Sequence, residues 1–202
     1  MSTLIKTCGM FRREDIAAVN EACPDFVGFV VNFPASHRSV SPEELKALRK
    51  ELRSGIKAVG VFVDEDPRLI AGLVGEGVID VVQLHGHEDE DYLADLRERC
   101  DASLFQAFKV RTPHDVERAR VSSADIVVLD NGFGTGERFD WDIAQTIDRP
   151  YMLAGGLTPE NIPEAIALLH PWAVDLSSGL ESGGVKDPAK IAAAVAAARD
   201  FE

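Results

Sequence analysis

Polar and apolar positions repeat along the chain in a regular order, in which a short apolar run precedes a longer stretch with apolar residues three or four positions apart. The short runs are nearly continuous in Val, Ile, Leu and Phe, which is typical of parallel strands covered on both faces. The longer stretches have the period of amphipathic helices. The expected strands are Leu4–Cys8, Phe26–Val31, Ala58–Val63, Val78–Leu84, Leu104–Phe108, Ile126–Leu129, Tyr151–Leu153 and Ala173–Leu176. The expected helices lie near residues 12–22, 43–53, 67–75, 88–99, 113–120, 140–146, 159–169 and 188–199.

Several of the expected helices begin with a capping side chain followed by proline, a common helix start. These starts are Ser41-Pro42, Asp66-Pro67, Thr112-Pro113 and Asp187-Pro188. Eight strand–helix units of roughly 25 residues favour an α/β fold of the closed (β/α)₈ TIM-barrel type. An open Rossmann sheet is the alternative, but no GxGxxG motif follows the first strand. No linker or charge block divides the chain, so we expect a single barrel domain over residues 1–202.

Two neighbouring units near the end of the chain carry small residues directly after the strand. Gly155 and Gly156 follow the seventh expected strand, and Ser178 and Gly179 follow the eighth. Thr158 then provides an expected helix cap. Small residues let backbone N–H groups approach an anion closely, and the loops after strands seven and eight of a barrel commonly bind phosphate. We interpret these loops as a phosphate clamp; the alternative is two ordinary tight turns.

Composition and net charge limit the classes of molecule that this chain is expected to bind. Of 202 residues, 46% are hydrophobic, and the net charge of −13 argues against nucleic acid or an anionic membrane as partner. The three cysteines, Cys8, Cys23 and Cys100, show neither a disulfide framework nor zinc spacing, which favours a reducing cytoplasmic compartment. The N-terminal residues do not form a signal sequence, and no apolar run approaches a membrane span. A small phosphorylated molecule is the expected partner.

The first strand ends in two residues with candidate chemistry. Lys6 and Cys8 share a face because side chains in a strand alternate. A cation beside a thiol lowers its pKa from roughly 8.5, which would make Cys8 a usable base or nucleophile. Burial as a small apolar residue is the equally frequent alternative for a cysteine.

Other strand ends carry further candidates. Asp130 closes the sixth expected strand and is a candidate acid or base, or else the start of an Asx turn. Arg38 follows the second strand and could grip a carboxylate or phosphate bidentately, although a solvated surface arginine is more frequent. His85, His87 and Glu88 follow the fourth strand, but His87 and Glu88 are better placed to open the next helix, so we expect no metal. Glycines 132, 134 and 136 indicate a lid or a simple turn.

Short motifs stand in order at strand ends throughout the chain. They are Lys6-Thr7-Cys8-Gly9, Gly28-Phe29-Val30, Ser36-His37-Arg38, Gln83-Leu84-His85-Gly86, Val128-Leu129-Asp130, Arg138-Phe139-Asp140-Trp141, the run from Gly155 to Asn161 and the run from Val174 to Glu181. This set resembles the motifs of the phosphoribosylanthranilate isomerase family of tryptophan biosynthesis. The combination of KxCG near the start with VDxSSGxE near the end is far more specific than a lone glycine-rich loop.

The resemblance implies a cofactor-independent Amadori isomerase on a ribulose-phosphate-binding barrel, acting as a monomer or homodimer. Its substrate would be N-(5-phosphoribosyl)anthranilate and its product 1-(2-carboxyphenylamino)-1-deoxyribulose 5-phosphate. The general base of the family falls on Cys8 and the general acid on Asp130. Arg38 would hold the anthranilate carboxylate. The phosphate-binding amides fall on Gly155, Gly156, Ser178 and Gly179.

The sequence departs from the family pattern in one loop, and other functions are alternatives. The loop after Asp130 is about one residue shorter than the family pattern. Related dual-substrate barrels resemble a pattern with aspartate as the base, so Cys8 favours the single-substrate enzyme. An indole-glycerol-phosphate synthase type would need a lysine and carboxylates at strand ends and would leave Cys8 without a task. A catalytically silent phosphosugar sensor would need neither Cys8 nor Asp130.

Overall fold

The computed structural model describes residues 3–130 and 141–200 and shows a closed barrel of eight parallel strands. The strands are β1 (Leu4–Cys8), β2 (Phe26–Val31), β4 (Lys57–Phe62), β5 (Val81–Leu84), β6 (Ser103–Lys109), β7 (Ile126–Asp130), β8 (Tyr151–Leu153) and β9 (Ala173–Leu176). Each pairs in parallel with the next, and β1 closes the ring by pairing with both β2 and β9. The expected TIM barrel is therefore confirmed.

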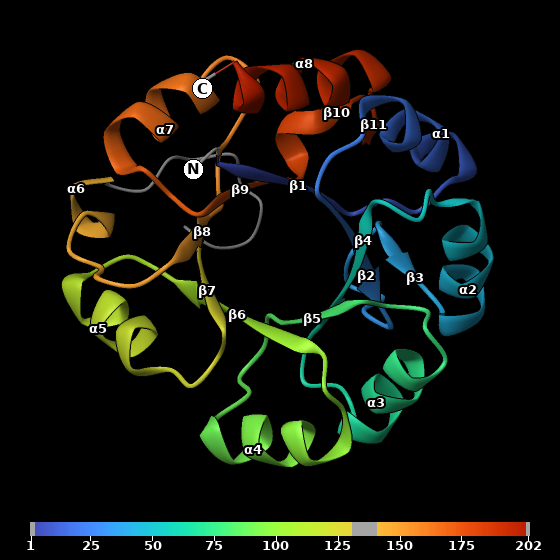
Figure 1. Ribbon diagram of the computed structural model, residues 1–202, viewed down its shortest axis with the longest axis horizontal. Coiled ribbons are helices and arrows are strands. Elements are labelled where there is room, and N and C mark those ends of the chain that lie inside the picture. Colours follow the sequence, from blue (N-terminus) through green and yellow to red (C-terminus); the bar gives the residue numbers. More distant parts are fainter. Residues whose placement is uncertain (1–2, 131–140, 201–202) are drawn as a thin grey trace.

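The helices form an outer ring around the strands (Figure 1). They are α1 (Arg13–Ala22), α2 (Pro42–Glu51), α3 (Pro67–Gly75), α4 (Glu90–Arg99), α5 (Pro113–Val121), α6 (Trp141–Ala144), α7 (Ile162–Leu169) and α8 (Pro188–Arg199). The proline start signals are correct. Ser41, for example, caps α2 by accepting a hydrogen bond from the Glu44 amide, and the Glu44 carboxylate accepts one from the Ser41 amide in return. No helix among the described residues is long and apolar enough to cross a membrane.

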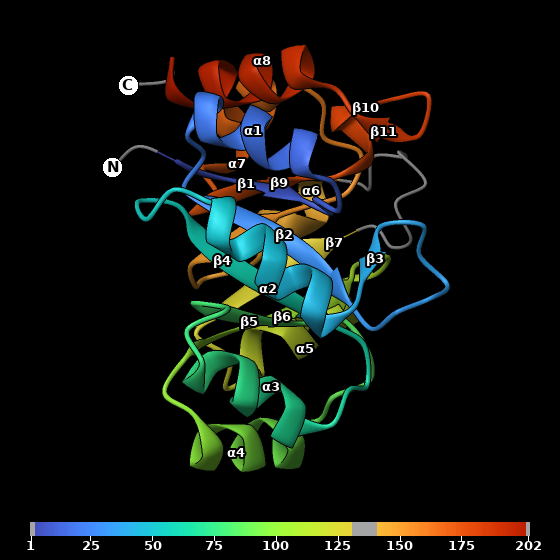
Figure 2. The same ribbon diagram turned by 90° about the vertical axis from the view of Figure 1, so that its right-hand side faces the viewer.

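Several short elements lie in the loops after the strands. They are β3 (Ser39–Val40) beside β2, the 3₁₀ turn η1 (Ser178–Leu180), and the antiparallel pair β10 (Glu181–Ser182) and β11 (Val185–Lys186). The strands β3, β10 and β11 gather at one end of the barrel (Figure 2). None of them was expected from the sequence, because two residues are too few to show a period.

Three expectations about element boundaries are corrected. Helix α7 begins at Ile162 rather than near 159, because the Asn161 side chain accepts a hydrogen bond from the Thr158 amide and holds that segment as a turn. Strand β5 begins at Val81, three residues later than expected. Glu88 is not part of α4, whose N-cap is Asp89. The glycine loop at 132–136 and the motif residues 138–140 lie outside the described residues.

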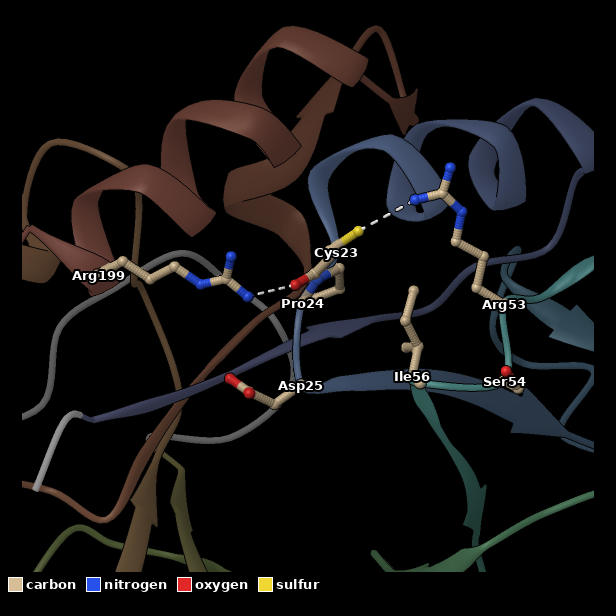
Figure 3. Close-up of a pocket in the computed structure, with 8 residues that line it drawn as sticks. Cys23, Pro24, Asp25, Arg53, Ser54, Ile56 and Arg199 are labelled. Atoms are coloured by element: carbon tan, nitrogen blue, oxygen red, sulfur yellow. Dashed lines mark hydrogen bonds between the residues drawn. The ribbon is translucent and has the colours of Figure 1, made fainter.

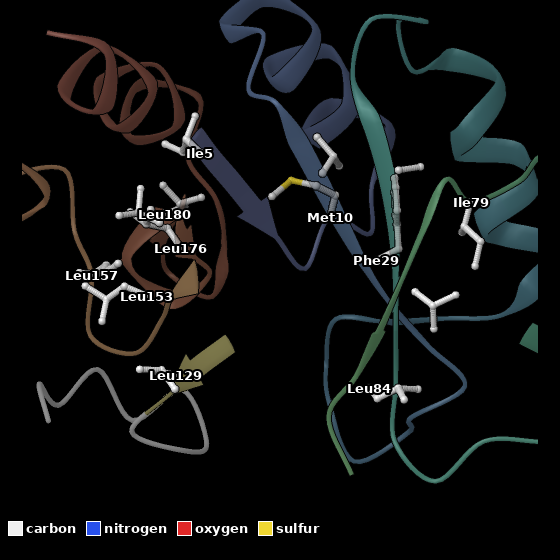
Figure 4. Close-up of a cluster of buried hydrophobic side chains, with 14 of the residues drawn as sticks. Ile5, Met10, Phe29, Ile79, Leu84, Leu129, Leu153, Leu157, Leu176 and Leu180 are labelled. Atoms are coloured by element: carbon white, nitrogen blue, oxygen red, sulfur yellow. The ribbon is translucent and has the colours of Figure 1, made fainter. Parts of the chain in front are cut away.

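Two apolar layers stabilise the barrel. The larger one lies between strands and helices and includes Ile5, Phe29 and Leu84 (Figure 4). The smaller one fills the barrel interior. It contains Cys8, Phe26, Val59, Val61, Val81, Phe105, Val128, Met152, Ala154 and Ala173. Since strand side chains alternate, residues such as Cys8 and Val128 point inward while Ile5 points to the helices.

Three aromatic rings pack together inside the barrel near the amino ends of the strands. The ring centroids of Phe26, Phe105 and Trp172 lie 5.7 to 5.9 Å apart. Two of these pairs pack edge-on and the third is tilted, and aromatic pairs add about 0.5–1.5 kcal/mol each beyond simple burial. The interior is therefore packed at this end, and the polar inward-facing residues lie closer to the carboxyl ends of the strands, where barrel enzymes hold their active sites.

Candidate active site

Strand β1 places a buried ion pair next to Cys8. Lys6 has no exposed surface, and its Nζ lies 2.8 Å from Oδ2 of Asp175, its register partner on β9. Within the described part of the chain, Oδ1 of Asp175 has no hydrogen-bond partner. Removing one member of such a pair strands the other charge and costs about 3–5 kcal/mol. The pair therefore fixes two charges inside the barrel.

The charge state of Cys8 differs from the expectation. Burial raises the pKa of the Cys8 thiol above its ordinary value of 9.0, and the nearby Lys6 ammonium lowers it only in part. Asp175 raises it further, whereas Lys186 lowers it. The prediction that Lys6 would bring this pKa below the usual range is wrong, because desolvation outweighs the cation. Burial also opposes the charge on Lys6, but Asp175 and Cys8 outweigh burial and raise the pKa of Lys6.

Gly28 makes room for the thiol and the ammonium. It is the register partner of Cys8 on β2. A Cβ at this position would lie 2.6 Å from Cys8 Sγ and 3.1 Å from Lys6 Nζ. The first distance is closer than real Cβ contacts, so any larger residue would push the thiol or the lysine away. Glycine at 28 is therefore required by the arrangement around Cys8.

Asp130 is the last residue of β7, on the same strand face as the interior residue Val128. It is 9% exposed, and its Oδ2 lies 3.4 Å from Nε2 of His85, which follows β5. In the sheet order β8 and β9 separate β7 from β1. Cys8 and Asp130 thus end two inward-facing strands at the same mouth of the barrel, on strands that β8 and β9 separate.

Arg38 is not a solvated surface residue. Its side chain is 18% exposed, and it donates from Nε to Glu181 Oε1 at 2.5 Å and from Nη2 to Oε2 at 2.9 Å. A Cβ on Gly9 would lie 2.5 Å from Arg38 Cδ, so the arginine stem packs directly over the residue that follows Cys8. The φ angle of Gly9 is +78°, which glycine adopts without strain. The structure therefore brings Arg38 and Cys8 together.

The two small-residue loops lie against each other. A Cβ on Gly179 would collide with the carbonyl oxygen of Leu157. Gly155 and Gly156 both have positive φ, at +84° and +67°. No described residue accepts a hydrogen bond from the backbone N–H of Gly155, Gly156, Ser178 or Gly179. Partly exposed and unpaired amides of this kind are the donors that an anion needs.

One expected feature of the clamp is absent. Thr158 does not cap a helix, since α7 begins at Ile162, and the Thr158 amide donates to Asn161 Oδ1 at 2.8 Å. Asn161 also donates from Nδ2 to the Gly156 carbonyl at 2.9 Å. Asn161 thus fixes the loop shape and takes up an amide that a helix terminus would have left available.

Metal ligation finds no support in the described residues, where no group of three or more His, Cys, Asp or Glu side chains converges. His87 instead pairs with Asp64, whose Oδ2 lies 3.0 Å from Nδ1. Glu88 accepts hydrogen bonds from the amides of Asp64 and Gly86 and so holds the two loops together.

A cavity of about 600 Å³ lies at the other end of the barrel, next to the amino ends of β2 and β4. Cys23, Arg53 and Arg199 line it, and Figure 3 shows both arginines reaching toward Cys23 from opposite sides. Arg53 donates to Cys23 Sγ at 3.5 Å. This cavity is remote from Cys8 and Arg38 and has no part in the candidate site.

Sequence reasoning missed several residues that shape the site. Asp175 and Glu181 entered only as letters of a motif, and Lys186 did not enter at all. Asp175 could have been found as a charged residue on the inward face of an apolar strand. Glu181 and Lys186 carry no comparable signal, because Glu181 acts through a contact with Arg38, far away in the chain, and Lys186 acts by anchoring Glu181.

The fold and the site define an enzyme-type (β/α)₈ barrel whose ionisable groups and partly exposed loop amides share one mouth. A family model described as N-(5'-phosphoribosyl)anthranilate (PRA) isomerase matches residues 5–197. The chain belongs to this family. It is 44% identical over 190 residues to N-(5'-phosphoribosyl)anthranilate isomerase of Clostridium kluyveri, covering 93% of each chain.

Solved structures agree with this assignment. The phosphoribosyl anthranilate isomerase of Thermus thermophilus superposes with a TM-score of 0.87 at 32% identity, covering 99% of this chain and 100% of the other. A phosphoribosyl anthranilate isomerase in complex with reduced 1-(o-carboxyphenylamino)-1-deoxyribulose 5-phosphate superposes with a TM-score of 0.86 at 34% identity, covering 98% and 100%.

Proposed function

We propose that this chain catalyses the Amadori rearrangement of N-(5-phosphoribosyl)anthranilate in tryptophan biosynthesis, with Cys8 as general base and Asp130 as general acid. The observation that carries the proposal is the shared mouth: a thiol, a carboxyl group, a guanidinium and four backbone amides with no acceptor among the described residues stand at the same end of one barrel. A substrate with a phosphate at one end and a carboxylate at the other matches these groups. Family membership supports the same reaction.

The reaction needs two proton movements at adjacent sugar atoms. Asp130, protonated when the substrate binds, donates to the ring oxygen, and the furanose opens to a Schiff base. The Cys8 thiolate then removes the proton from C2, and the resulting enolamine tautomerises to the ketone. Each positioned acid or base of this type contributes about 10²–10⁴-fold. Holding the sugar at both ends supplies further rate enhancement by orientation.

The surroundings of Cys8 suit a base that works on a carbon acid. Burial keeps the thiol protonated more than an exposed cysteine, but the thiolate formed is correspondingly more basic. Lys6 and Lys186 supply positive charge that favours the thiolate. We expect the protein to function in a reducing cytoplasm, which would keep this thiol out of disulfide bonds.

Turnover is the direct test. Phosphoribosylanthranilate is fluorescent, and its conversion to the ketose product is followed by the loss of that fluorescence on adding the protein. We expect complete conversion without added metal or cofactor. A chain that binds the reduced product analogue but leaves the fluorescence unchanged would be a phosphosugar-binding barrel, which is the rival function.

Replacing Arg38 should chiefly impair binding of the anthranilate end. Arg38→Ala removes a charge-assisted hydrogen-bonding partner worth about 1.5–3 kcal/mol, so KM should rise about 10- to 100-fold with a smaller change in kcat. Steady-state kinetics measures both constants. Unchanged kinetics would mean that Arg38 only pairs with Glu181.

The phosphate clamp can be tested with a single methyl group. Gly179→Ala would force the Ser178–Leu180 turn away from the Leu157 carbonyl and should weaken the binding of ribose 5-phosphate about tenfold, which is about 1.4 kcal/mol. Gly72→Ala is the matched control, since a Cβ there meets open space within helix α3. Titration calorimetry compares both variants with the wild type. Equal affinities in all three would remove Gly179 from the phosphate site.

A further inference from the structure

The Arg38–Glu181 pair joins the second and the last strand–helix loops, at positions 143 residues apart in the chain. Glu181 contacts Nε and Nη2, which form the side-on edge of the guanidinium. A carboxylate on this edge makes a bidentate pair of fixed geometry. The exposed fractions of 18% for Arg38 and 10% for Glu181 show that solvent screens the pair little. Glu181 therefore sets the orientation of the arginine head group.

The guanidinium has a second, end-on edge, made by Nη1 and the remaining N–H of Nη2. In the part of the chain that the structure describes, no acceptor occupies Nη1. A ligand carboxylate can therefore bind bidentately to this edge while Glu181 stays in place. Binding on the side-on edge would instead require Glu181 to leave.

Glu181 is itself anchored. Lys186, whose side chain has no exposed surface, donates to Glu181 Oε1 at 2.9 Å and to the Ser177 carbonyl at 2.8 Å. Although burial opposes the charge, the hydrogen bonds from Arg38 and Lys186 hold the pKa of Glu181 at about 2. His37 adds a third nitrogen, with Nε2 at 3.9 Å from Oε2. Glu181 is therefore a fixed anion at any working pH.

The charges around this pair favour binding of an anion. Arg38 and Lys186 carry two positive charges, and Glu181 neutralises one of them. The stem of Arg38 lies over Gly9, next to Cys8. This packing keeps the positive charge of the arginine near the candidate base. The same carboxylate thus prevents two cations from repelling each other and leaves the site with a net attraction for one ligand carboxylate.

We propose that Glu181, anchored by Lys186, is a positioning residue that presents the end-on edge of Arg38 to the aromatic carboxylate of the substrate. The inference rests on the proposed function, because it requires Arg38 to bind that carboxylate. A glutamine at 181 would offer only one acceptor oxygen and would turn an amide N–H₂ toward a group that is itself a donor. Arg38 would then lose its fixed orientation while keeping its charge.

The test compares two probes on Glu181→Gln. The reduced product analogue carries both carboxylate and phosphate, whereas ribose 5-phosphate carries the phosphate alone. We expect about tenfold weaker binding of the analogue, equivalent to about 1.4 kcal/mol, with the affinity for ribose 5-phosphate unchanged. KM should rise by a similar factor, and kcat should change less. Glu117→Gln is the matched control, because Glu117 makes an equivalent bidentate pair with Arg120 on the exposed side of α5 and should affect neither probe.

Glu181→Gln leaves the buried Lys186 ammonium without its carboxylate and could prevent folding. The double variant Glu181→Gln with Lys186→Met removes both charges together, and we expect the same selective loss of analogue binding. Analogue affinity equal to or tighter than that of the wild type in a folded variant overturns the inference. Equal losses for both probes also overturn it, since they would indicate a collapsed loop. A wild-type chain that does not bind the analogue overturns the proposed function itself, and with it this inference.

Discussion

Cys8→Ser should lower kcat by about 10²–10⁴-fold, the contribution typical of one positioned general base. The serine hydroxyl is similar in size to the thiol but far less acidic, so it cannot form a comparable anion near neutral pH. Because the substituted atom lies in a packed interior beside Gly28, the change should leave the binding of the reduced product analogue nearly intact. Stopped-flow turnover and analogue titration measure the two quantities separately.

The pH dependence provides an internal check on this variant. Since the pKa of Cys8 is raised above 9.0, the thiolate fraction in the wild type grows as the pH rises through and beyond that value. kcat/KM should therefore increase along an acidic limb that lies above the ordinary thiol range, and Cys8→Ser should lose this limb. Cys23→Ser, in the cavity at the opposite end of the barrel, is the control and should behave as the wild type. Near-normal kcat in Cys8→Ser would return Cys8 to a packing role.

Asp130→Asn should reduce kcat by a similar factor of about 10²–10⁴, for a different reason. The amide matches the carboxyl group in size and can still contact His85, but it has no proton to give to the ring oxygen. Ring opening should then become the slow step, while binding of the reduced analogue, whose ring is already open, should be largely retained. Single-turnover kinetics in the presence of excess protein measures this step.

The control for this prediction is Asp91→Asn, the same chemical change on the exposed surface of α4. It should leave both turnover and binding unchanged. If Asp130→Asn also retains turnover, another group must protonate the ring oxygen. His85, whose Nε2 lies 3.4 Å from Asp130, would be the first candidate to examine.

The barrel could be predicted from the sequence because each strand and helix depends mainly on residues close together in the chain. The bounds of β1, β2, β8 and β9 agree with the nearly continuous apolar runs in the sequence, and the helices with a capping residue followed by proline begin where these signals predict. Thr158-Pro159 shows the limit of this reasoning. It has the composition of a helix start, but the side chain of Asn161 three residues later competes for the Thr158 amide and delays α7 to Ile162.

The sequence predicted residues of the candidate site only where the residue type and its position at a strand end were informative by themselves. Cys8, Arg38 and Asp130 stand at strand ends and could be listed from the sequence. The net shift of the Cys8 pKa could not be predicted, because burial outweighs the lowering by Lys6, and spacing in the sequence contains no information on burial. Glu181 acts through its pair with Arg38, which forms only when the loops after β2 and β9 come together, and Lys186 acts by anchoring Glu181.

The pairing of β1 with β9 has a consequence for folding during synthesis. Lys6 and Asp175, which pair inside the barrel, are separated by 169 positions, and β1 has no β9 to pair with until almost the whole chain has left the ribosome. Contacts so distant in sequence form late and slowly during folding. A nascent chain of seven strands would expose one edge of β1 and carry an uncompensated lysine beside Cys8. We therefore expect the surroundings of Cys8 to form late in folding, and a chain truncated before Asp175 would lack the carboxylate that pairs with Lys6.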